Sequence, residues 1–544
     1  MKKVSAMCKI YLSEFHPVTN GSEDASVALR RCFSEASSYR APVIVIEPGT
    51  YLMDSDMPVL LSSGMEVVAD GAKFYFPQKL GENHDRVLFY GENISNFKWR
   101  GGKFTGYVYN PKAADNVWEP HTHTSCIEIY RTESGKADNL IFKHIEAENI
   151  AGPVVFVHGT KEGSRRHYAE NIDVRNCNFI NCGKFMWDYG YLWQKIVFSY
   201  LYHPREVENA LQYMPKEYMS SALKMKNGRL YADYMPQKRD GEWDTVSFFG
   251  ASMPEGLERG KQYYVVNEGC ENGIEISETK NGEPISVGTD GKDMYLFRNM
   301  FYIYHDLFAP VGNHSPAKGA VDVTLCKNVI ITNCRISASG DSMHILESEN
   351  VVFSNNQILG ARMGAFYIGF FCKNITVTGN TVFGANGSRI VSVERSSENI
   401  TIVGNTFSGG GRGTWINQPN NLILCENIFI ENTNKCTPDP KRGRVCYATG
   451  GFERYPEIYF TTWQDGAAYG PVIVKSNIIQ TNEYALSAVT FNPGGRDILF
   501  ESNVISGSVK NIHIAKGCDL QMRNNIGIEN VTDEMFVNVA NVPF

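Results

Sequence analysis

The sequence predicts an all-β fold: a right-handed parallel β-helix with an N-terminal capping helix and an inserted small β/α subdomain. Three observations support this prediction. A short phrase containing Asn recurs every 22 to 26 residues through much of the chain. Apolar and polar residues alternate within the short runs between these phrases, and the repeated region has no helical periodicity.

The repeated phrase is a polar residue, then Asn, then an apolar-rich stretch. Its positions are Asn178, Cys334, Asn356, Asn380, Asn405, Asn427, Asn477, Asn503 and Asn525. The 50 residues between positions 427 and 477 predict two coils joined by a longer loop. Because each coil lies about 4.8 Å above the last, equivalent residues form ladders and the inward Val, Ile and Phe residues form one core.

A second Asn precedes an alternating strand in many coils, as at Asn328 and Asn399. Asparagine tolerates left-handed backbone angles and hydrogen-bonds locally, which suits a repeated turn. We therefore interpret both sets of asparagines as structural.

The remaining segments predict the organisation of the chain. Residues 24–33 have helical spacing with an Asp near the start, as expected of a helix that caps an open solenoid end. We expect residues 1–190 to hold this cap and the first coils, 191–305 an inserted helix and small β subdomain, and 306–544 the main coils with a long loop at 436–470. Within the insertion, residues 205–225 have the spacing of an amphipathic helix.

Composition excludes several classes of protein. The 544 residues are 43% hydrophobic and 20% charged with a net charge of −7, so neither disorder nor a nucleic-acid partner is expected. No apolar run reaches the roughly 18–20 residues of a membrane span, and no signal peptide is visible. Thirteen cysteines without zinc spacing fit buried thiols. We expect a cytoplasmic protein, or a secreted or periplasmic one if a signal has been removed.

Chemistry-bearing residues align on equivalent strands of the coils. If Val321 and Met343 point inward, Asp322, His344 and Tyr367 point outward on neighbouring coils, because side chains alternate along a strand. A carboxylate, an imidazole, a phenol and several arginines on one stripe predict a functional groove. Further candidates for this face are Glu128, Asp188, Arg362, Arg389, Glu394, Arg412 and Trp415.

At Gly340-Asp341-Ser342-Met343-His344-Ile345 the sequence resembles the polygalacturonase family of glycoside hydrolases, within the pectate-lyase-like β-helix superfamily. Asp341 matches the second of two family aspartates, and Gly340 stands at the first, which is normally the general acid. Arg389-Ile390-Val391 keeps the arginine of the family's Arg-Ile-Lys motif, and Arg362-Met363-Gly364 matches its Gly-His-Gly stretch without the histidine. Asp322 is the carboxylate nearest to the place of the Asn-Thr-Asp motif. The resemblance implies a distant relative that acts on a polysaccharide.

The first hypothesis is hydrolysis of glycosidic bonds in a poly- or oligosaccharide, with acidic sugars as candidates and an exo mode favoured by the insertion and the long loop. Hydrolysis needs two carboxyl groups, which we assign to Asp322 and Asp341, with His344 beside them. The arginines would bind substrate oxygens or a uronate carboxylate, and Tyr367 and Trp415 would stack on sugar rings.

Two alternatives stay open. In a polysaccharide lyase, arginines would neutralise a uronate carboxylate while His344 or Tyr367 abstracts the α-proton. In a non-enzymatic protein, the β-helix would bind glycans or serve as a tailspike-like shaft. The sequence predicts no metal site and no cofactor, and it leaves a homo-oligomer open.

Overall fold

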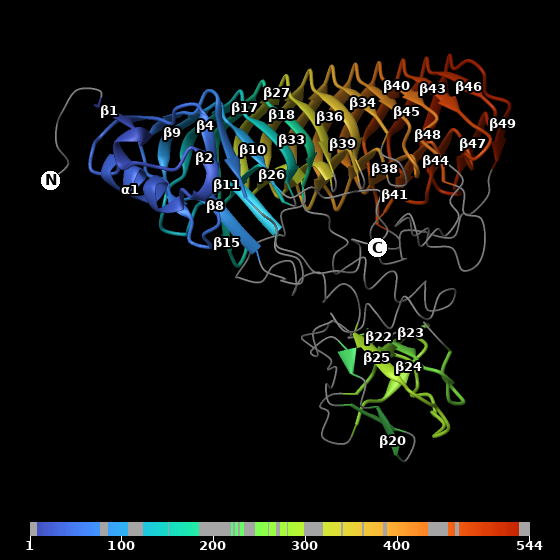
Figure 1. Ribbon diagram of the computed structural model, residues 1–544. Helices are drawn as coiled ribbons and strands as arrows, with labels where there is room; N and C mark the ends of the chain where they lie inside the picture. Colours follow the sequence, from blue (N-terminus) through green and yellow to red (C-terminus); the bar gives the residue numbers. More distant parts are fainter. Residues whose placement is uncertain are drawn as a thin grey trace.

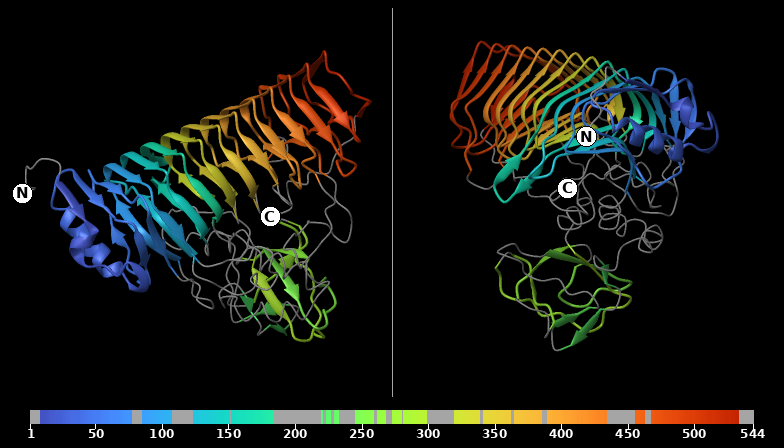
Figure 2. Two further views of the ribbon diagram at one scale, coloured as in Figure 1. Left: turned by 45° about the horizontal axis from the view of Figure 1, so that its top comes forward. Right: turned by 90° about the vertical axis from the view of Figure 1, so that its left-hand side faces the viewer.

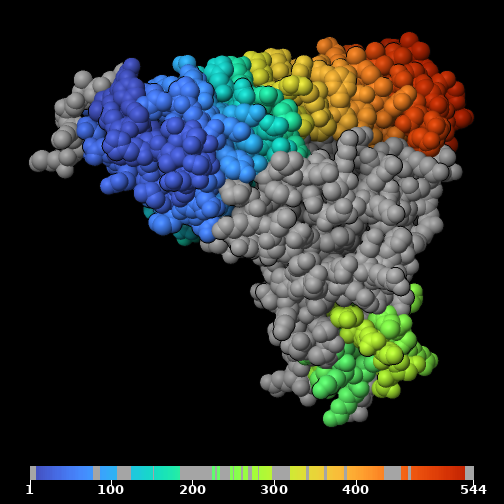
Figure 3. All heavy atoms as spheres, in the orientation of Figure 1, coloured from blue at the N-terminus to red at the C-terminus, as the bar shows by residue number. Residues whose placement is uncertain are grey.

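The computed structural model describes most of the chain. The described residues are 8–76, 85–106, 123–150, 152–183, 219–220, 223–226, 229–232, 245–258, 261–267, 273–279, 281–298, 319–338, 341–361, 364–384, 389–433, 455–462 and 467–532. Three long parallel sheets follow one another around each coil and stack along one axis (Figure 1). The coils form a continuous body from the blue N-terminal end to the red C-terminal end (Figure 3).

Sheet 1 has fourteen strands and takes one strand from nearly every coil. In spatial order they are β1 (Cys8–Tyr11), β3 (Pro42–Val45), β6 (Glu66–Val68), β9 (Ser95–Arg100), β12 (Asp138–Lys143), β17 (Ala169–Arg175), β27 (Cys326–Thr332), β30 (Glu349–Ser354), β33 (Lys373–Thr378), β36 (Glu398–Val403), β39 (Asn420–Cys425), β42 (Val472–Lys475), β45 (Ile498–Glu501) and β48 (Leu520–Arg523).

Sheet 2 has thirteen strands in the same stacking direction. They are β2 (Asn20–Asp24), β4 (Gly49–Leu52), β7 (Ala72–Tyr75), β10 (Lys103–Thr105), β13 (Glu146–Ile150), β18 (Asn178–Cys182), β28 (Arg335–Ala338), β31 (Gln357–Ala361), β34 (Thr381–Phe383), β37 (Thr406–Ser408), β40 (Ile428–Ile430), β43 (Ile478–Thr481) and β46 (Val504–Gly507).

Sheet 3 also has thirteen strands and carries the predicted polar stripe. They are β5 (Val59–Leu60), β8 (Asp85–Glu92), β11 (His123–Tyr130), β14 (Val155–His158), β26 (Gly319–Thr324), β29 (Asp341–Leu346), β32 (Phe366–Gly369), β35 (Val391–Val393), β38 (Thr414–Asn417), β41 (Ile458–Thr461), β44 (Val489–Phe491), β47 (Asn511–Ile514) and β49 (Asn530–Thr532). These sheets confirm the predicted parallel β-helix, and Figure 2 shows the nested coils from two further directions.

The core is a stack of inward side chains that begins in the first coils and runs through the last. Alternate residues of sheet 1 strands, such as Val351 and Phe353, are fully buried. Ring stacking continues the pattern between coils, as for Phe407 and Phe429, whose centroids lie 5.2 Å apart. Burial of each such side chain contributes about 1.5–3 kcal/mol, so the solenoid is held together by many equal layers.

One buried asparagine ladder runs between sheets 1 and 2. The side chain of Asn405 accepts hydrogen bonds at Oδ1 from the backbone N and from Nδ2 of Asn380, both at 2.9 Å. Its own Nδ2 donates to the carbonyl of Val377 at 2.9 Å and to Oδ1 of Asn427 at 3.0 Å. The ladder satisfies backbone groups that the corner would otherwise leave buried without partners.

The same ladder corrects one prediction. Asn427 donates from its backbone N and from Nδ2 to Oδ1 of Asn477, both at 3.0 Å. β40 also pairs directly with β43. The 50-residue interval is therefore a single coil with a long excursion, and the predicted extra coil is wrong. The strand β41 lies inside the segment that was expected to be a loop.

The second asparagine set is exposed and bonds along the stack. Asn350, Asn374 and Asn399 have φ values of 56°, 55° and 54°. Their amides link neighbouring coils at 2.9 Å, from Asn374 to Asn350 and from Asn399 to Asn374. Left-handed backbone angles are costly for most residues and mild for Asn, which explains its repetition at this corner.

The N-terminal end is covered by helix α1 (Ser26–Ala36), as predicted, after a short 3₁₀ helix η1 (Leu12–Phe15). Leu29, Cys32 and Phe33 are buried against the first coils. Phe33 lies 5.7 Å from Phe89, ring centre to ring centre, so the cap continues the aromatic core of the first layers.

A small antiparallel subdomain lies between β18 and β26 in the sequence. It comprises a five-stranded sheet, β19 (Met219–Ser220), β25 (Tyr295–Arg298), β22 (Thr245–Phe249), β23 (Gln262–Val265) and β24 (Ile276–Ser277), and a pair, β20 (Lys224–Lys226) and β21 (Arg229–Tyr231). It has its own core around Phe248, Tyr263 and Leu296. The end of the 205–225 segment, expected to be helical, holds strands β19 and β20, and its earlier part lies outside the described residues.

Candidate functional site

The outward face of sheet 3 brings the predicted polar residues onto consecutive coils. Asp322 on β26 is in register with His344 on β29, and His344 is in register with Tyr367 on β32. Their neighbours Val321, Val323 and Ile345 are core residues. The alternation that puts apolar side chains inside therefore puts these three outside.

Asp322 and His344 form a buried pair. Oδ2 of Asp322 lies 2.8 Å from Nδ1 of His344, and both side chains are fully buried. Asp322 also accepts hydrogen bonds from Thr324 Oγ1 at 3.2 Å and from the backbone N of Gly319 at 3.3 Å. A neutral imidazole that donates a hydrogen bond from Nδ1–H to this carboxylate carries its lone pair on Nε2.

The other ring nitrogen of His344 is unusual. Nε2 is buried and has no hydrogen-bond partner among the residues that the structure describes. A buried polar atom without a partner is costly, and such atoms often mark a place for a ligand or a reacting group.

Tyr367 joins this pair to a second carboxylate. Its ring stacks on His344 with centroids 5.0 Å apart and planes inclined by 28°. Its hydroxyl donates to Oε2 of Glu394 at 3.2 Å. Glu394 is nearly buried and also accepts a hydrogen bond from Ser392 Oγ at 2.7 Å.

Arg389 completes the chain of contacts. It forms an ion pair with Glu394, and its guanidinium lies 3.5 Å from the centre of the Trp415 ring. Trp415 donates from Nε1 to the carbonyl of Arg412 at 3.1 Å and meets Tyr459 edge-on at 5.3 Å. Because Trp415 holds the guanidinium from one side and Glu394 from another, Arg389 is fixed in orientation.

Glu128 lies two strands before Asp322 and forms a different pair. Oε1 of Glu128 is 3.2 Å from Nε2 of His158 on β14. The His158 ring stacks between Phe156 at 4.3 Å and Tyr130 at 4.7 Å, centroid to centroid. Glu128 thus belongs to the same face but not to the chain of contacts around His344.

Three predicted site residues are not brought into the site by the described residues. Asp188 and Arg362 lie outside the described part of the chain. Asp341 is the first residue of β29, where its backbone is in register with Gly319, and the structure does not describe its side chain. The residue that the structure sets against Asp322 is therefore His344 rather than a second carboxylate.

Arg412 is placed differently from the other arginines. It is nearly buried, and its guanidinium lies 5.6 Å from the centre of the Tyr455 ring. Its carbonyl orients Trp415 and its backbone bridges to Thr433, so Arg412 lies at the edge of the site.

Sequence reasoning missed several residues near this face. Tyr459 and Asn492 extend the ladder beyond Trp415, with Asn492 Nδ2 donating to Tyr459 Oη at 2.6 Å. Burial raises the pKa of Tyr459. Strand β41 lies in the misread interval between 427 and 477, although alternation within Ile458–Thr461 carried the signal, and Asn492 follows β44 beyond that interval.

Glu457 was also missed, one residue before β41. It is fully buried, and burial raises the pKa of its carboxyl from 4.5 to about 8. Asn432 donates to it from the backbone N at 3.0 and 2.9 Å and from Nδ2 at 2.6 Å. Asn432 itself accepts from the backbone N of Gly410 at 3.0 Å, so Glu457 stands where the next asparagine of a ladder would be.

Within the described residues, no group of three or more His, Cys, Asp or Glu side chains is arranged to hold a metal ion. No helix among them is long and apolar enough to cross a membrane.

The fold agrees with known β-helix proteins. Residues 313–452 match the family described as a right handed beta helix region. No curated protein matches the chain. This match and the three stacked parallel sheets confirm the predicted right-handed parallel β-helix.

Three solved structures illustrate the likeness. The A-module of the mannuronan C-5 epimerase AlgE6 from Azotobacter vinelandii is 11% identical, with 95% of this chain and 98% of that chain covered and a TM-score of 0.46. An exopolygalacturonase from Thermotoga maritima is 11% identical, with 97% and 93% covered and a TM-score of 0.45. PfbA, a surface adhesin of Streptococcus pneumoniae, is 13% identical, with 95% and 89% covered and a TM-score of 0.43. Likeness at this level assigns no activity to this chain.

Proposed function

We propose that this protein is a carbohydrate-active enzyme that cleaves an acidic glycan by β-elimination on the outward face of sheet 3. The observation that supports the proposal is the Asp322–His344 pair. Nδ1 of His344 lies 2.8 Å from Oδ2 of Asp322, and Nε2 is buried without a partner among the described residues. A carboxylate on Nδ1 fixes the tautomer that makes Nε2 a general base.

The proposed step starts at the carbon next to the uronate carboxylate. His344 Nε2 takes the proton of this carbon, a C=C bond forms to the adjacent carbon, and the C–O bond to the leaving sugar breaks. The leaving oxygen takes a proton from the Tyr367 hydroxyl, which stacks beside His344 on the next coil. Solvent then returns the proton from His344 to Tyr367, so that atoms and charges balance.

Arg389 supplies the positive charge that this chemistry needs. A cation near the uronate carboxylate acidifies the neighbouring C–H by stabilising the negative charge that develops. Arg389 is held between Glu394 and Trp415, and its side chain and that of Tyr367 remain partly exposed. The sugar is therefore proposed to approach His344 from the side of Tyr367 and Arg389.

Hydrolysis is less well supported by the same contacts. It requires one carboxyl group that carries a proton and a second carboxylate at a defined separation. Asp322 accepts from Thr324 and Gly319, and Glu394 accepts from Ser392 and Tyr367, so in these contacts neither carboxyl group acts as a proton donor. The non-enzymatic alternative is also less well supported, because a structural shaft does not need a chain of polar contacts on the outward face of sheet 3.

One assay separates the candidates. The protein is incubated with polygalacturonate and with alginate, and both new reducing ends and near-ultraviolet absorbance are followed. Elimination produces both signals: cleavage frees a reducing end, and the other product carries a C=C bond conjugated to the carboxylate, which absorbs in the near ultraviolet. Reducing ends without absorbance would establish hydrolysis instead, and neither signal would favour a binding or structural protein.

A further inference from the structure

A basic hairpin projects from the coil that carries His158. It consists of β15 (Thr160–Glu162) and β16 (Arg165–His167), which pair antiparallel between β14 and β17. The next two coils turn the same corner with one residue, Leu325, and with two, Glu347 and Ser348. The excursion is therefore not required to turn the corner.

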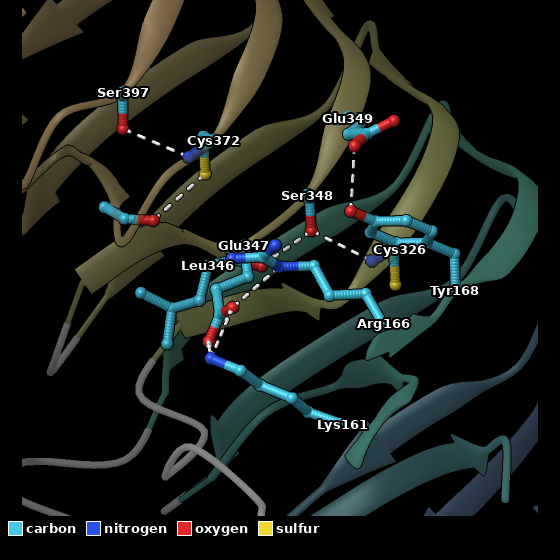
Figure 4. Close-up of polar contacts among 11 residues, drawn as sticks. Lys161, Arg166, Tyr168, Cys326, Leu346, Glu347, Ser348, Glu349, Cys372 and Ser397 are labelled. Carbon is cyan, nitrogen blue, oxygen red and sulfur yellow. Dashed lines mark hydrogen bonds and ion pairs between the residues drawn. The ribbon is translucent and has the colours of Figure 1, made fainter. Parts of the chain in front are cut away.

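The hairpin carries two cations directly opposite each other. Lys161 is in register with Arg166, and two like charges in such a cross-strand pair repel. Glu347, two coils further on, relieves this repulsion (Figure 4). Lys161 Nζ lies 3.2 and 3.0 Å from its two carboxylate oxygens, and Arg166 Nε donates to Oε2 at 2.8 Å.

Among the described residues, the cluster holds three cations and two carboxylates. One carboxylate faces two cations, and the exposed Arg165 adds a third beside Glu162. Arg166 uses only Nε for Glu347, so among the described residues its two terminal amino groups have no partner. Lys161 and Arg166 are 33% and 28% exposed, which leaves them within reach of a ligand. This local excess contrasts with the net charge of −7 for the whole chain.

The position of the cluster relates it to the proposed reaction centre. Glu347 follows His344 by three residues, at the end of β29. Next to it the corner carries Phe371, which is 47% exposed, and Arg395, whose guanidinium lies 3.7 Å from the centre of the Phe370 ring. An aromatic and cationic edge beside a basic hairpin suits a sugar ring bearing a carboxylate.

We propose that the β15–β16 hairpin is a binding subsite for a carboxylate of an acidic glycan, with Lys161, Arg165 and Arg166 as its donors and Glu347 as a built-in competitor. This inference rests on the proposed function for the class of substrate. It concerns binding alone, so it can be tested without any turnover.

The test measures the affinity for fluorescently labelled oligogalacturonate and oligoalginate by polarisation at low and high salt. The double variant Lys161→Gln/Arg166→Gln is expected to bind at least tenfold more weakly at low salt, and the difference should shrink at high salt. Glu347→Gln is expected to bind several-fold more tightly, because the competing carboxylate is gone. Lys73→Gln removes an exposed cation from the outer face of β7 and should change nothing.

Thermal unfolding of each variant checks that the fold is kept. Binding of the double variant equal to that of the unmodified protein for both oligosaccharides would overturn the inference. So would weaker binding by a folded Glu347→Gln variant, which would make Glu347 a merely structural partner. Binding that follows the expected order in a protein without cleavage activity would support the subsite and count against β-elimination.

Discussion

Asp322 and His344 are 22 residues apart in the sequence, yet their side chains meet at 2.8 Å because they occupy the same place on adjacent coils. Equivalent residues on adjacent coils are separated in space only by the distance between two neighbouring strands. Residues that would otherwise be remote thereby act as a unit, and the function of either one depends on the other.

Replacing Asp322 by Asn tests this dependence. The Asn amide can donate to Nδ1, which places the ring proton on Nε2 and removes the general base. We expect the rate of β-elimination to fall by at least about 10²-fold, within the range of general-base catalysis. Initial rates from near-ultraviolet absorbance, compared at equal folded fraction by circular dichroism, provide the measurement. An unchanged rate in a folded variant would assign the base elsewhere.

Tyr367→Phe separates the hydroxyl from the ring. Phe keeps the stacking on His344 and loses the proton donor that hydrogen-bonds to Glu394. We expect kcat to fall by about 10²–10⁴-fold with little change in KM. The melting temperature should change little because the ring still stacks on His344 and Glu394 keeps its contacts with Ser392 and Arg389. If Phe supports the original kcat, the leaving oxygen receives its proton from another group.

Glu457 predicts a dependence of stability on pH. The pKa of its carboxyl is 4.5 ordinarily and about 8 in the fold, so the folded state holds the proton more tightly than the unfolded state. The free energy of unfolding contributed by this group is therefore greatest below about pH 4.5 and falls as pH rises to about 8, by roughly 1.4 kcal/mol per pH unit at most.

Glu457→Gln should remove that dependence. Gln resembles the protonated acid, and its carbonyl oxygen can accept from Asn432 at every pH. Urea denaturation at pH 5, 7 and 9 should show a smaller loss of stability with pH in the variant than in the unmodified protein. Parallel curves for the two proteins would mean that the Glu457 carboxyl titrates alike in the folded and unfolded states, which would contradict its raised pKa.

The two asparagine ladders predict a matched pair of substitutions. Asn405→Ala removes the acceptor of the buried backbone N of Asn380 and the donor to the carbonyls of Val377 and Val403, on two adjacent coils, and each buried group left without a partner costs about 1–3 kcal/mol. Asn399→Gly removes exposed contacts that water can replace and tolerates the φ of 54° at this position, so it should cost less than about 1 kcal/mol. Equilibrium denaturation compares them directly. Equal costs would show that the buried ladder is not what fixes this corner.

Regular spacing is what made the fold predictable. A repeated asparagine every 22 to 26 residues, with alternation between, was enough to predict the coils and the outward direction of Asp322, His344 and Tyr367. The same reasoning predicted two coils in the interval after Asn427, where the structure has one coil with a long excursion. The length of an interval does not by itself reveal how many coils it contains. Contacts made by excursions, such as Lys161 with Glu347, depend on how a hairpin folds back and leave no periodic signal.

Strand β17 hydrogen-bonds directly to β27, and β18 to β28, although the small antiparallel subdomain lies between them in the sequence. Pairing thus continues across the insertion, with one register shift between Phe179 and Cys182 of β18, and among the described residues no strand of the subdomain takes part in it. Changes within the subdomain are therefore not transmitted to the coils through shared strand pairing.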